Sequence, residues 1–165
     1  MKPQTELTQN EIKIRNAEPE DIKQINKIYV DGSKDELKIQ FSGKQLKENL
    51  KLFNKYKYER LKGFEKNINN KKQYFIVAVN NNLVIGFGQV NLSDKKAYIE
   101  KVYIDKNYKK KEISKIIIKE MINWLKKQKA DYVNIFIFSK DKFSIKLYEK
   151  LGFKPITLNM WRNLR

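Results

Sequence analysis

A change of hydrophobic period in the middle of the chain is the feature that most restricts its fold. Tyr74–Val79 (YFIVAV) is an apolar run of strand length, and Asn80–Asn82 follows it with residues that tolerate the left-handed backbone of tight turns. Leu83–Leu92 (LVIGFGQVNL) returns as a second strand, so the two runs predict an antiparallel hairpin. A second turn, Ser93–Lys96, leads to a third strand at Ala97–Ile104.

A long amphipathic helix follows this third strand and restricts the topology of the sheet. One face of the helix carries, at helical spacing, Ile113, Ile117, Met121 and Trp124. The next segment, Asp131–Phe138, is apolar enough to be a central strand. Two neighbouring strands that are joined by a crossover helix run parallel. We therefore predict a mixed sheet in an α/β or α+β fold.

The N-terminal half predicts one strand and several helices. Glu11–Arg15 alternates between polar and apolar residues, as a short strand does. Pro19 is placed for the first turn of a helix, which we expect to end at Gly32. Residues 34–70 are polar and mainly helical in pattern.

The C-terminal segment predicts a short helix over residues 140–153, ended by Gly152, and then one or two last strands within residues 154–164. No linker of Pro, Gly or Ser interrupts the chain, so we predict one domain over residues 1–165. The expected sheet is mixed and mostly antiparallel, with six to seven strands flanked by helices.

The chain of 165 residues contains no cysteine and no histidine. The missing cysteines exclude disulfides, thiolate metal sites and cysteine nucleophiles. The missing histidines remove the usual neutral-pH general base and the commonest metal ligand, and we expect no metal cofactor. Acid–base chemistry must therefore use carboxylates, tyrosine, lysine, the chain termini or water.

The formal net charge of +17 suggests a polyanionic partner such as a nucleic acid or a phosphorylated cofactor. However, most of the positive charge is lysine, and asparagine and isoleucine are also abundant, as expected from a bias toward A/T-rich codons. Arginine, the preferred base reader, is present at four positions only. The N-terminal residues lack a signal-peptide core, and no apolar run is long enough to span a bilayer. We expect a cytoplasmic protein without a membrane partner.

Three motifs together resemble a known family: VIGFGQV (84–90), VYIDKNYKKKEIS (102–114) and FSIKLYEKLGF (143–153). From about Ile12 to Leu164, the chain resembles the GNAT superfamily of acyl-CoA-dependent N-acyltransferases. The closing segment is the most specific, because the family pattern there is Asn-x-x-Ala-x-x-x-Tyr-x-x-x-Gly-Phe. The matching residues here, at intact spacing, are Asp141, Ser144, Tyr148, Gly152 and Phe153.

This resemblance implies a binding site for acyl-CoA. In the family, the strand before the long helix splays from its neighbour, and the pantetheine arm binds its backbone; Ile99–Ile104 has that position here. The following loop and helix N-terminus bind the pyrophosphate. The implied cofactor-binding residues are Val102, Tyr103, Ile104, Lys109, Lys110, Lys111, Glu112, Ile113, Ser114, Lys115, Asp141, Ser144 and Tyr148.

The loop departs from the family pattern Gln/Arg-x-x-Gly-x-Gly/Ala, since Lys109, Glu112 and Ser114 have the patterned positions. Glycine lets the backbone approach a pyrophosphate, whereas the Glu112 carboxylate competes for the same amides and repels phosphate. On another interpretation, Glu112 only offsets the positive end of the helix. Five lysines crowd the turn and would hold phosphates through charge, with greater salt dependence: Lys106, Lys109, Lys110, Lys111 and Lys115.

Two residues are candidates for the transfer chemistry. Tyr148 matches the family's acid, and a tyrosine with a pKa near 10 can protonate the departing thiolate. It equally fits a core aromatic on the last helix. Glu100 is the candidate base and shares a face with Tyr98 and Val102 by strand alternation. It also fits a solvent-facing residue paired with Lys101, and many family members use an ordered water instead.

The resemblance implies an N-acetyltransferase that transfers an acetyl group from acetyl-CoA to a primary amine of a small molecule or peptide. Residues 34–70 and 154–164 are expected to select the acceptor, with Tyr29, Tyr74 and the aromatics of 53–64 as pocket candidates or core residues. Four scattered acids, Asp35, Glu36, Glu48 and Glu59, would make that pocket locally acidic, although acids at such spacing on a helix are usually only solvated. Two alternatives remain: a non-catalytic GNAT-like protein without acyl-CoA binding, and a basic nucleic-acid-associated module. A homodimer is compatible with each.

Overall fold

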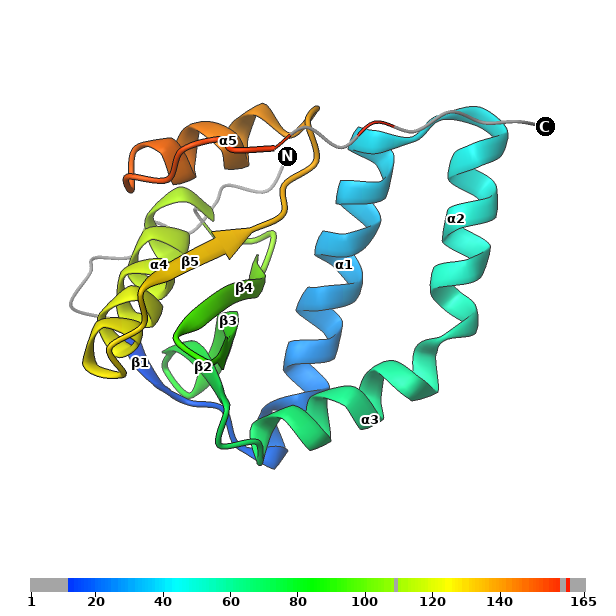
Figure 1. The fold of residues 1–165 in the computed structure, drawn as a ribbon. Coiled ribbons are helices and arrows are strands. Elements are labelled where there is room, and N and C mark those ends of the chain that lie inside the picture. Colours follow the sequence, from blue (N-terminus) through cyan, green and yellow to red (C-terminus); the bar gives the residue numbers. More distant parts are fainter. Residues whose placement is uncertain (1–11, 109, 158–159, 161–165) are drawn as a thin grey trace.

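The computed structural model describes residues 12–108, 110–157 and 160. Within this part of the chain, a five-stranded sheet has the order β1-β2-β3-β4-β5 (Figure 1). The strands are β1 (Lys13–Asn16), β2 (Gln73–Asn80), β3 (Leu83–Ser93), β4 (Lys96–Ile104) and β5 (Tyr132–Ile135). Neighbouring strands are antiparallel except for β4 and β5, which are parallel. The predicted hairpin and the predicted parallel pair are therefore confirmed.

The helices lie on both faces of this sheet (Figure 1). A short 3-10 helix (Pro19–Asp21) leads into α1 (Ile22–Gln40), and α2 (Gly43–Lys55) and α3 (Lys57–Ile68) follow. The crossover helix is α4 (Lys110–Lys127), and α5 (Lys142–Glu149) follows β5. One core packs the sheet against α4 and α5, and a second packs its other face against α1 and α3.

The two tight turns of the antiparallel region contain no glycine. Asn81 and Asn82 join β2 to β3 with φ angles of 47° and 63°, and Asp94 and Lys95 join β3 to β4 with 47° and 67°. Asparagine and aspartate adopt this left-handed backbone more readily than most residues, so these turns form as the sequence predicts.

Gly32 does not end the first helix, because α1 continues to Gln40. A Cβ atom at Gly32 would lie 2.3 Å from Cδ1 of Tyr103 on β4. The glycine therefore allows α1 to pack closely against the Tyr103 ring, and the structure corrects the prediction that Gly32 is a helix terminus. The helical pattern predicted for residues 34–70 is confirmed.

The predicted count of six to seven strands is too high for the described part of the chain. Residues 154–157 are exposed and form no strand, and Pro155 has no N–H group to donate to a ladder. The remainder of the predicted last strands, residues 158, 159 and 161–164, lies outside the described residues. The strand predicted over Asp131–Phe138 is also shorter, since β5 ends at Ile135.

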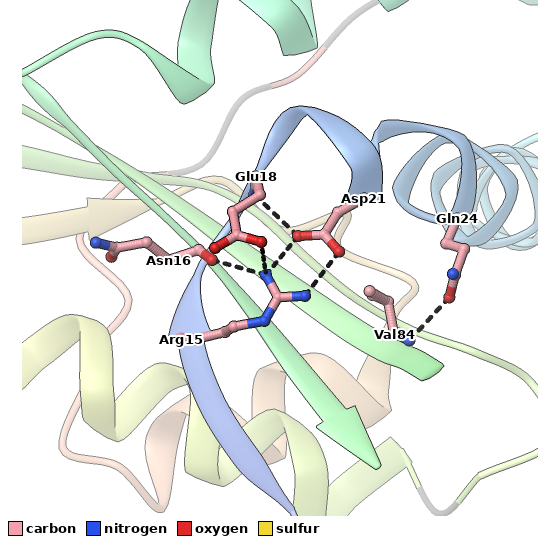
Figure 2. Close-up of polar contacts among 6 residues, drawn as sticks. All are labelled: Arg15, Asn16, Glu18, Asp21, Gln24 and Val84. Carbon is pink, nitrogen blue, oxygen red and sulfur yellow. Dashed lines mark hydrogen bonds and ion pairs between the residues drawn. The ribbon is translucent and has the colours of Figure 1, made fainter. Parts of the chain in front are cut away.

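A charged cluster anchors the start of α1 to the sheet (Figure 2). Arg15 on β1 donates two hydrogen bonds to the Asp21 carboxylate, at 2.6 Å and 2.9 Å, and the Glu18 amide donates a third at 2.9 Å. One turn later, Gln24 accepts a hydrogen bond of 2.8 Å from the Val84 amide of β3. These contacts fix the orientation of α1 across the sheet.

We expect Asp21→Asn to lower the free energy of unfolding by about 1–2 kcal/mol at neutral pH, because it weakens a charged pair that is partly exposed at Arg15. Burial alone would raise the pKa of Asp21, but the hydrogen bonds from Arg15 and Glu18 lower it below its usual value. The stabilisation is therefore present above the unfolded pKa of about 4 and is lost as the pH falls through the lower folded pKa.

Urea unfolding of the Asp21 variant and of the unsubstituted chain, at neutral pH and at about pH 3, measures this difference. Glu20→Gln removes an exposed carboxylate from the same turn and is the matched control. A stability difference between the Asp21 variant and the unsubstituted chain that does not shrink in acid would contradict the role of the ion pair.

Candidate active site

The parallel strands β4 and β5 part in the middle of β4. Their pairing runs from Lys96 opposite Tyr132 to Ile99 opposite Ile135. β5 ends there, whereas β4 continues to Ile104. Beyond Ile99, the edge of β4 that faces β5 therefore has no strand partner in the described part of the chain. An extended ligand chain can hydrogen bond to an edge of this kind.

A β-bulge lies where the strands part. Gln89 of β3 is opposite Lys101 and Val90 is opposite Ile99, so Glu100 is the additional residue on β4. The Glu100 carboxylate accepts a hydrogen bond of 3.0 Å from the side-chain NH₂ group of the buried Gln89 and lies 3.7 Å from the Lys101 ammonium. Val102 instead packs in the core beneath α4. The predicted shared face of Glu100 and Val102 is therefore wrong, because the bulge interrupts the alternation.

A cleft of about 660 Å³ lies over the sheet face that α1 and α3 cover. Its walls come from α1, α2, α3 and β4, and Phe138, which follows β5, bounds it. The aromatic lining residues are Tyr29, Phe53, Tyr56, Phe64, Tyr103 and Phe138, and the charged ones are Glu36, Glu59, Arg60 and Lys101. This volume is typical of a site for a small molecule.

Tyr103 forms one wall of the cleft and is held in place by α1. Its hydroxyl donates a hydrogen bond of 2.7 Å to Glu36, and the Ser33 hydroxyl donates one of 3.4 Å to Tyr103. Burial, together with the negative charge of Glu36, raises the pKa of Tyr103 well above its ordinary value. The Tyr103 side chain is thus a fixed, protonated part of the cleft wall.

Tyr148 lies on α5 and is buried in the core beneath α4 and α5. Its ring makes an edge-to-face contact with Phe153, with centroids 5.1 Å apart. Burial raises the pKa of Tyr148 well above 10, and the charges of Glu36 and Asp141 raise it further. A tyrosine in this state remains protonated at neutral pH and can donate a proton.

The turn between β4 and α4 is organised by Asp105. Its carboxylate accepts hydrogen bonds from the Asn107 amide at 2.9 Å and from the Asn107 side chain at 2.8 Å. Lys106 forms an ion pair of 3.3 Å with Asp31 on α1. Among the described side chains, Lys106 is therefore one of two predicted phosphate-binding lysines that are already paired with a carboxylate, and Lys115 is the other.

The first turn of α4 contains the other predicted phosphate contacts. Glu112 forms an ion pair of 3.4 Å with Lys115, and Ile113 and Ser114 are buried. Lys109 lies outside the described residues, as do the side chains of Lys110 and Lys111. Binding of a pyrophosphate at this helix terminus stays a prediction.

Asp141 and Ser144, which are predicted to contact the cofactor, begin α5. Asp141 is the N-cap residue and accepts a hydrogen bond of 3.0 Å from the Ser144 amide and one of 2.6 Å from the Ser144 hydroxyl. The structure thus explains both residues as a helix cap, and their contact with a cofactor stays a prediction.

The cleft contains residues that the sequence suggested and others that it did not. Tyr29, Glu36 and Glu59 line it as suggested, whereas Asp35 and Glu48 are not among its lining residues and Tyr74 stacks on Trp124 against the other sheet face. Arg60 and Lys101 also line it, although the sequence singled out neither as a pocket residue. Arg60 had one signal in the sequence, since it is a rare arginine in a lysine-rich chain.

Comparison with known proteins identifies the fold and the family. A sequence model of the acetyltransferase (GNAT) family matches residues 38–153. The chain belongs to this family. No curated protein sequence matches it. In the part of the chain that the structure describes, no helix is long and apolar enough to span a membrane, and no cluster of three acidic side chains is arranged to hold a metal ion.

Several solved structures have the same GNAT fold. The PaiA N-acetyltransferase from Thermoplasma acidophilum, in complex with coenzyme A, is 21% identical, with a TM-score of 0.76 over 90% of this chain and 92% of that one. The ribosomal-protein-S18-alanine N-acetyltransferase from Escherichia coli is 15% identical, with a TM-score of 0.63 over 88% of this chain and 79% of that one. An aminoglycoside acetyltransferase from an uncultured soil metagenomic sample, in complex with sisomicin, is 18% identical, with a TM-score of 0.65 over 94% and 98%.

Proposed function

We propose that this GNAT protein transfers an acetyl group from acetyl-CoA to a primary amine. The main support for this proposal is the separation of β4 and β5 after Ile99. The cleft lies on one face of the sheet there, and Tyr148 packs on the other face. The pantetheine arm would bind the free edge of β4 at Val102–Ile104, and the amine would enter from the cleft. The coenzyme A bound to PaiA supports the choice of cosubstrate.

The transfer itself needs one base and one acid. The amine nitrogen attacks the thioester carbon, forming the C–N bond, and the C–S bond breaks as CoA leaves. Glu100 accepts the proton that the amine loses, and Tyr148 gives its hydroxyl proton to the CoA thiolate. Support for these roles comes from the position of Glu100 on the bulge, beside the point where β4 and β5 part, and from the match of Tyr148 to the acid position of the family motif.

The experiment that tests this function measures release of free CoA thiol from acetyl-CoA, with and without amines. A panel of amino acids, peptides, polyamines and aminoglycosides covers the acceptor classes. We expect thiol release that depends on the amine, and a mass increase of one acetyl group on the acceptor. Slow thioester hydrolysis that no amine accelerates would contradict the proposal.

We also expect that the Glu112 carboxylate weakens cofactor binding. Glu112→Gln should tighten binding of CoA about twofold to fivefold, because it removes a negative charge beside the phosphates at the start of α4. Isothermal titration at low salt measures this change. Glu65→Gln removes an exposed carboxylate from α3 and is the control. Unchanged or weaker binding in the Glu112 variant would show that Glu112 does not face the phosphates.

A further inference from the structure

Two cationic side chains that line the cleft lie near the same aromatic ring. The Arg60 guanidinium carbon is 5.8 Å from the ring centroid of Tyr29, and the Lys101 ammonium is 6.0 Å from the same centroid. The Arg60 guanidinium also lies 4.3 Å from the Phe53 ring. Arg60 comes from α3 and Lys101 from β4, so the cleft brings together two charges that are distant in the sequence.

The hydrogen bonds of Arg60 are incomplete. Its Nη1 atom donates to the Phe53 carbonyl at 3.0 Å, which fixes the side chain against the cleft wall. Its Nε atom is buried and has no hydrogen-bond partner among the residues that the structure describes. A buried donor without a partner is destabilising, and a guanidinium presents its N–H groups in a fork that fits a carboxylate. The geometry therefore favours an anionic ligand group at Arg60.

The Lys101 ammonium also lacks a close partner in its ion pair. Its side chain is 22% exposed, and the carboxylate of its ion pair, Glu100, is 3.7 Å away, beyond hydrogen-bond distance. That carboxylate already accepts a hydrogen bond from Gln89. An anionic group in the cleft would give the Lys101 ammonium a closer partner.

The charges that line the cleft are mixed in sign. Glu36 and Glu59 provide negative charge, and Arg60 and Lys101 balance it. A polycationic acceptor would meet two positive charges in this space, whereas a ligand with one ammonium and one carboxylate has a partner for each. The aromatic walls complement an apolar body between the two charged groups.

We propose that the acceptor is an amine that also carries a carboxylate, an amino acid or short peptide with an apolar side chain, whose carboxylate binds Arg60 and Lys101. This inference rests on the proposed function only where it calls the ligand an acetyl acceptor. Binding of the carboxylate at Arg60 and Lys101 does not require catalysis. The test therefore has one binding arm and one kinetic arm.

The binding arm uses N-acetylphenylalanine and N-acetylphenylalanine amide, which are matched except for the carboxylate and lack a free amine. Isothermal titration should give binding of the acid about tenfold tighter than that of the amide, as expected for one charge-assisted hydrogen bond. Arg60→Gln and Lys101→Met should each remove most of this preference, and Arg60→Lys should restore only part of it. Lys51→Met, at an exposed position on α2, should keep it. Thermal melting of each variant shows that it is folded.

The kinetic arm compares phenylalanine, phenylalanine amide and phenethylamine as acceptors. We expect kcat/KM to be about tenfold higher for the acid than for the other two compounds, and this preference to disappear in Arg60→Gln. Equal binding of acid and amide, or higher kcat/KM for amines without a carboxylate, overturns the inference. Arg60-dependent binding of the acid without acetylation of any amine would instead uphold the carboxylate site and contradict the proposed function.

Discussion

Replacing Tyr148 with phenylalanine should slow amine-dependent release of CoA by about a hundredfold or more, while the dissociation constant of CoA changes by less than about twofold. The substitution keeps the ring that contacts Phe153 and removes only the hydroxyl. The CoA thiolate would then leave without a positioned proton donor. Steady-state kinetics and isothermal titration of the same preparation measure the two quantities.

Tyr74→Phe is the matched control, because Tyr74 is a half-buried tyrosine that also packs beneath α4 and stacks on Trp124, with centroids 4.9 Å apart. Its hydroxyl donates to Glu120 at 3.4 Å, away from the cleft. We expect near-normal turnover in this variant. If Tyr148→Phe leaves turnover unchanged, or reduces turnover and CoA affinity equally, then Tyr148 has a packing role and not an acid role.

Gly32→Ala should lower the free energy of unfolding by about 2–3 kcal/mol, one of the largest effects expected from a single methyl group. The new Cβ would lie 2.3 Å from Cδ1 and 2.9 Å from Cε1 of the Tyr103 ring. That ring cannot easily move away, since its hydroxyl is bonded to Glu36 and the ring stacks against Phe87 with centroids 5.7 Å apart. Chemical unfolding with urea measures the change.

Gly63→Ala is the control for this substitution. Gly63 lies inside α3, and a Cβ there meets no atom within 4 Å. Alanine is the better helix former, so this variant should be stabilised by up to about 1 kcal/mol. The same alanine substitution is thus expected to have opposite signs in two helices. Equal effects at the two glycines would show that the contact between α1 and Tyr103 is not tight.

The sequence predicted the elements whose signals are local. The hairpin of β2 and β3, the third strand and the amphipathic α4 all have a clear period, and the asparagine turn carries its own conformational preference. The parallel pairing of β4 and β5 followed from the crossover helix. One error, at Gly32, lies where a tertiary contact overrides a local rule. In the sequence, Gly32 looks like a helix terminus. In the structure, it lets α1 pack against the ring of Tyr103, which is 71 positions later in the chain.

The candidate site was predictable only in part, for the same reason. The resemblance of the last helix to the GNAT motif singled out Tyr148, and the position of Glu100 on the matching strand singled out that residue; both roles stay predictions. The bulge at Glu100 has no signature in the sequence, so the orientation of Lys101 into the cleft could not be foreseen. Arg60 approaches Tyr29 through the packing of α3 beside α1, a contact between helices that their apolar patterns do not specify.

The most direct test of the account is isothermal titration of the protein with acetyl-CoA and with CoA at low ionic strength. We expect saturable binding of one cofactor per chain, and affinity that falls as salt is added, as predicted for a site that holds the phosphates through lysine charge in place of a glycine-rich loop. Absence of binding for both compounds at millimolar concentration would contradict the acetyltransferase function and leave a GNAT fold without its cosubstrate.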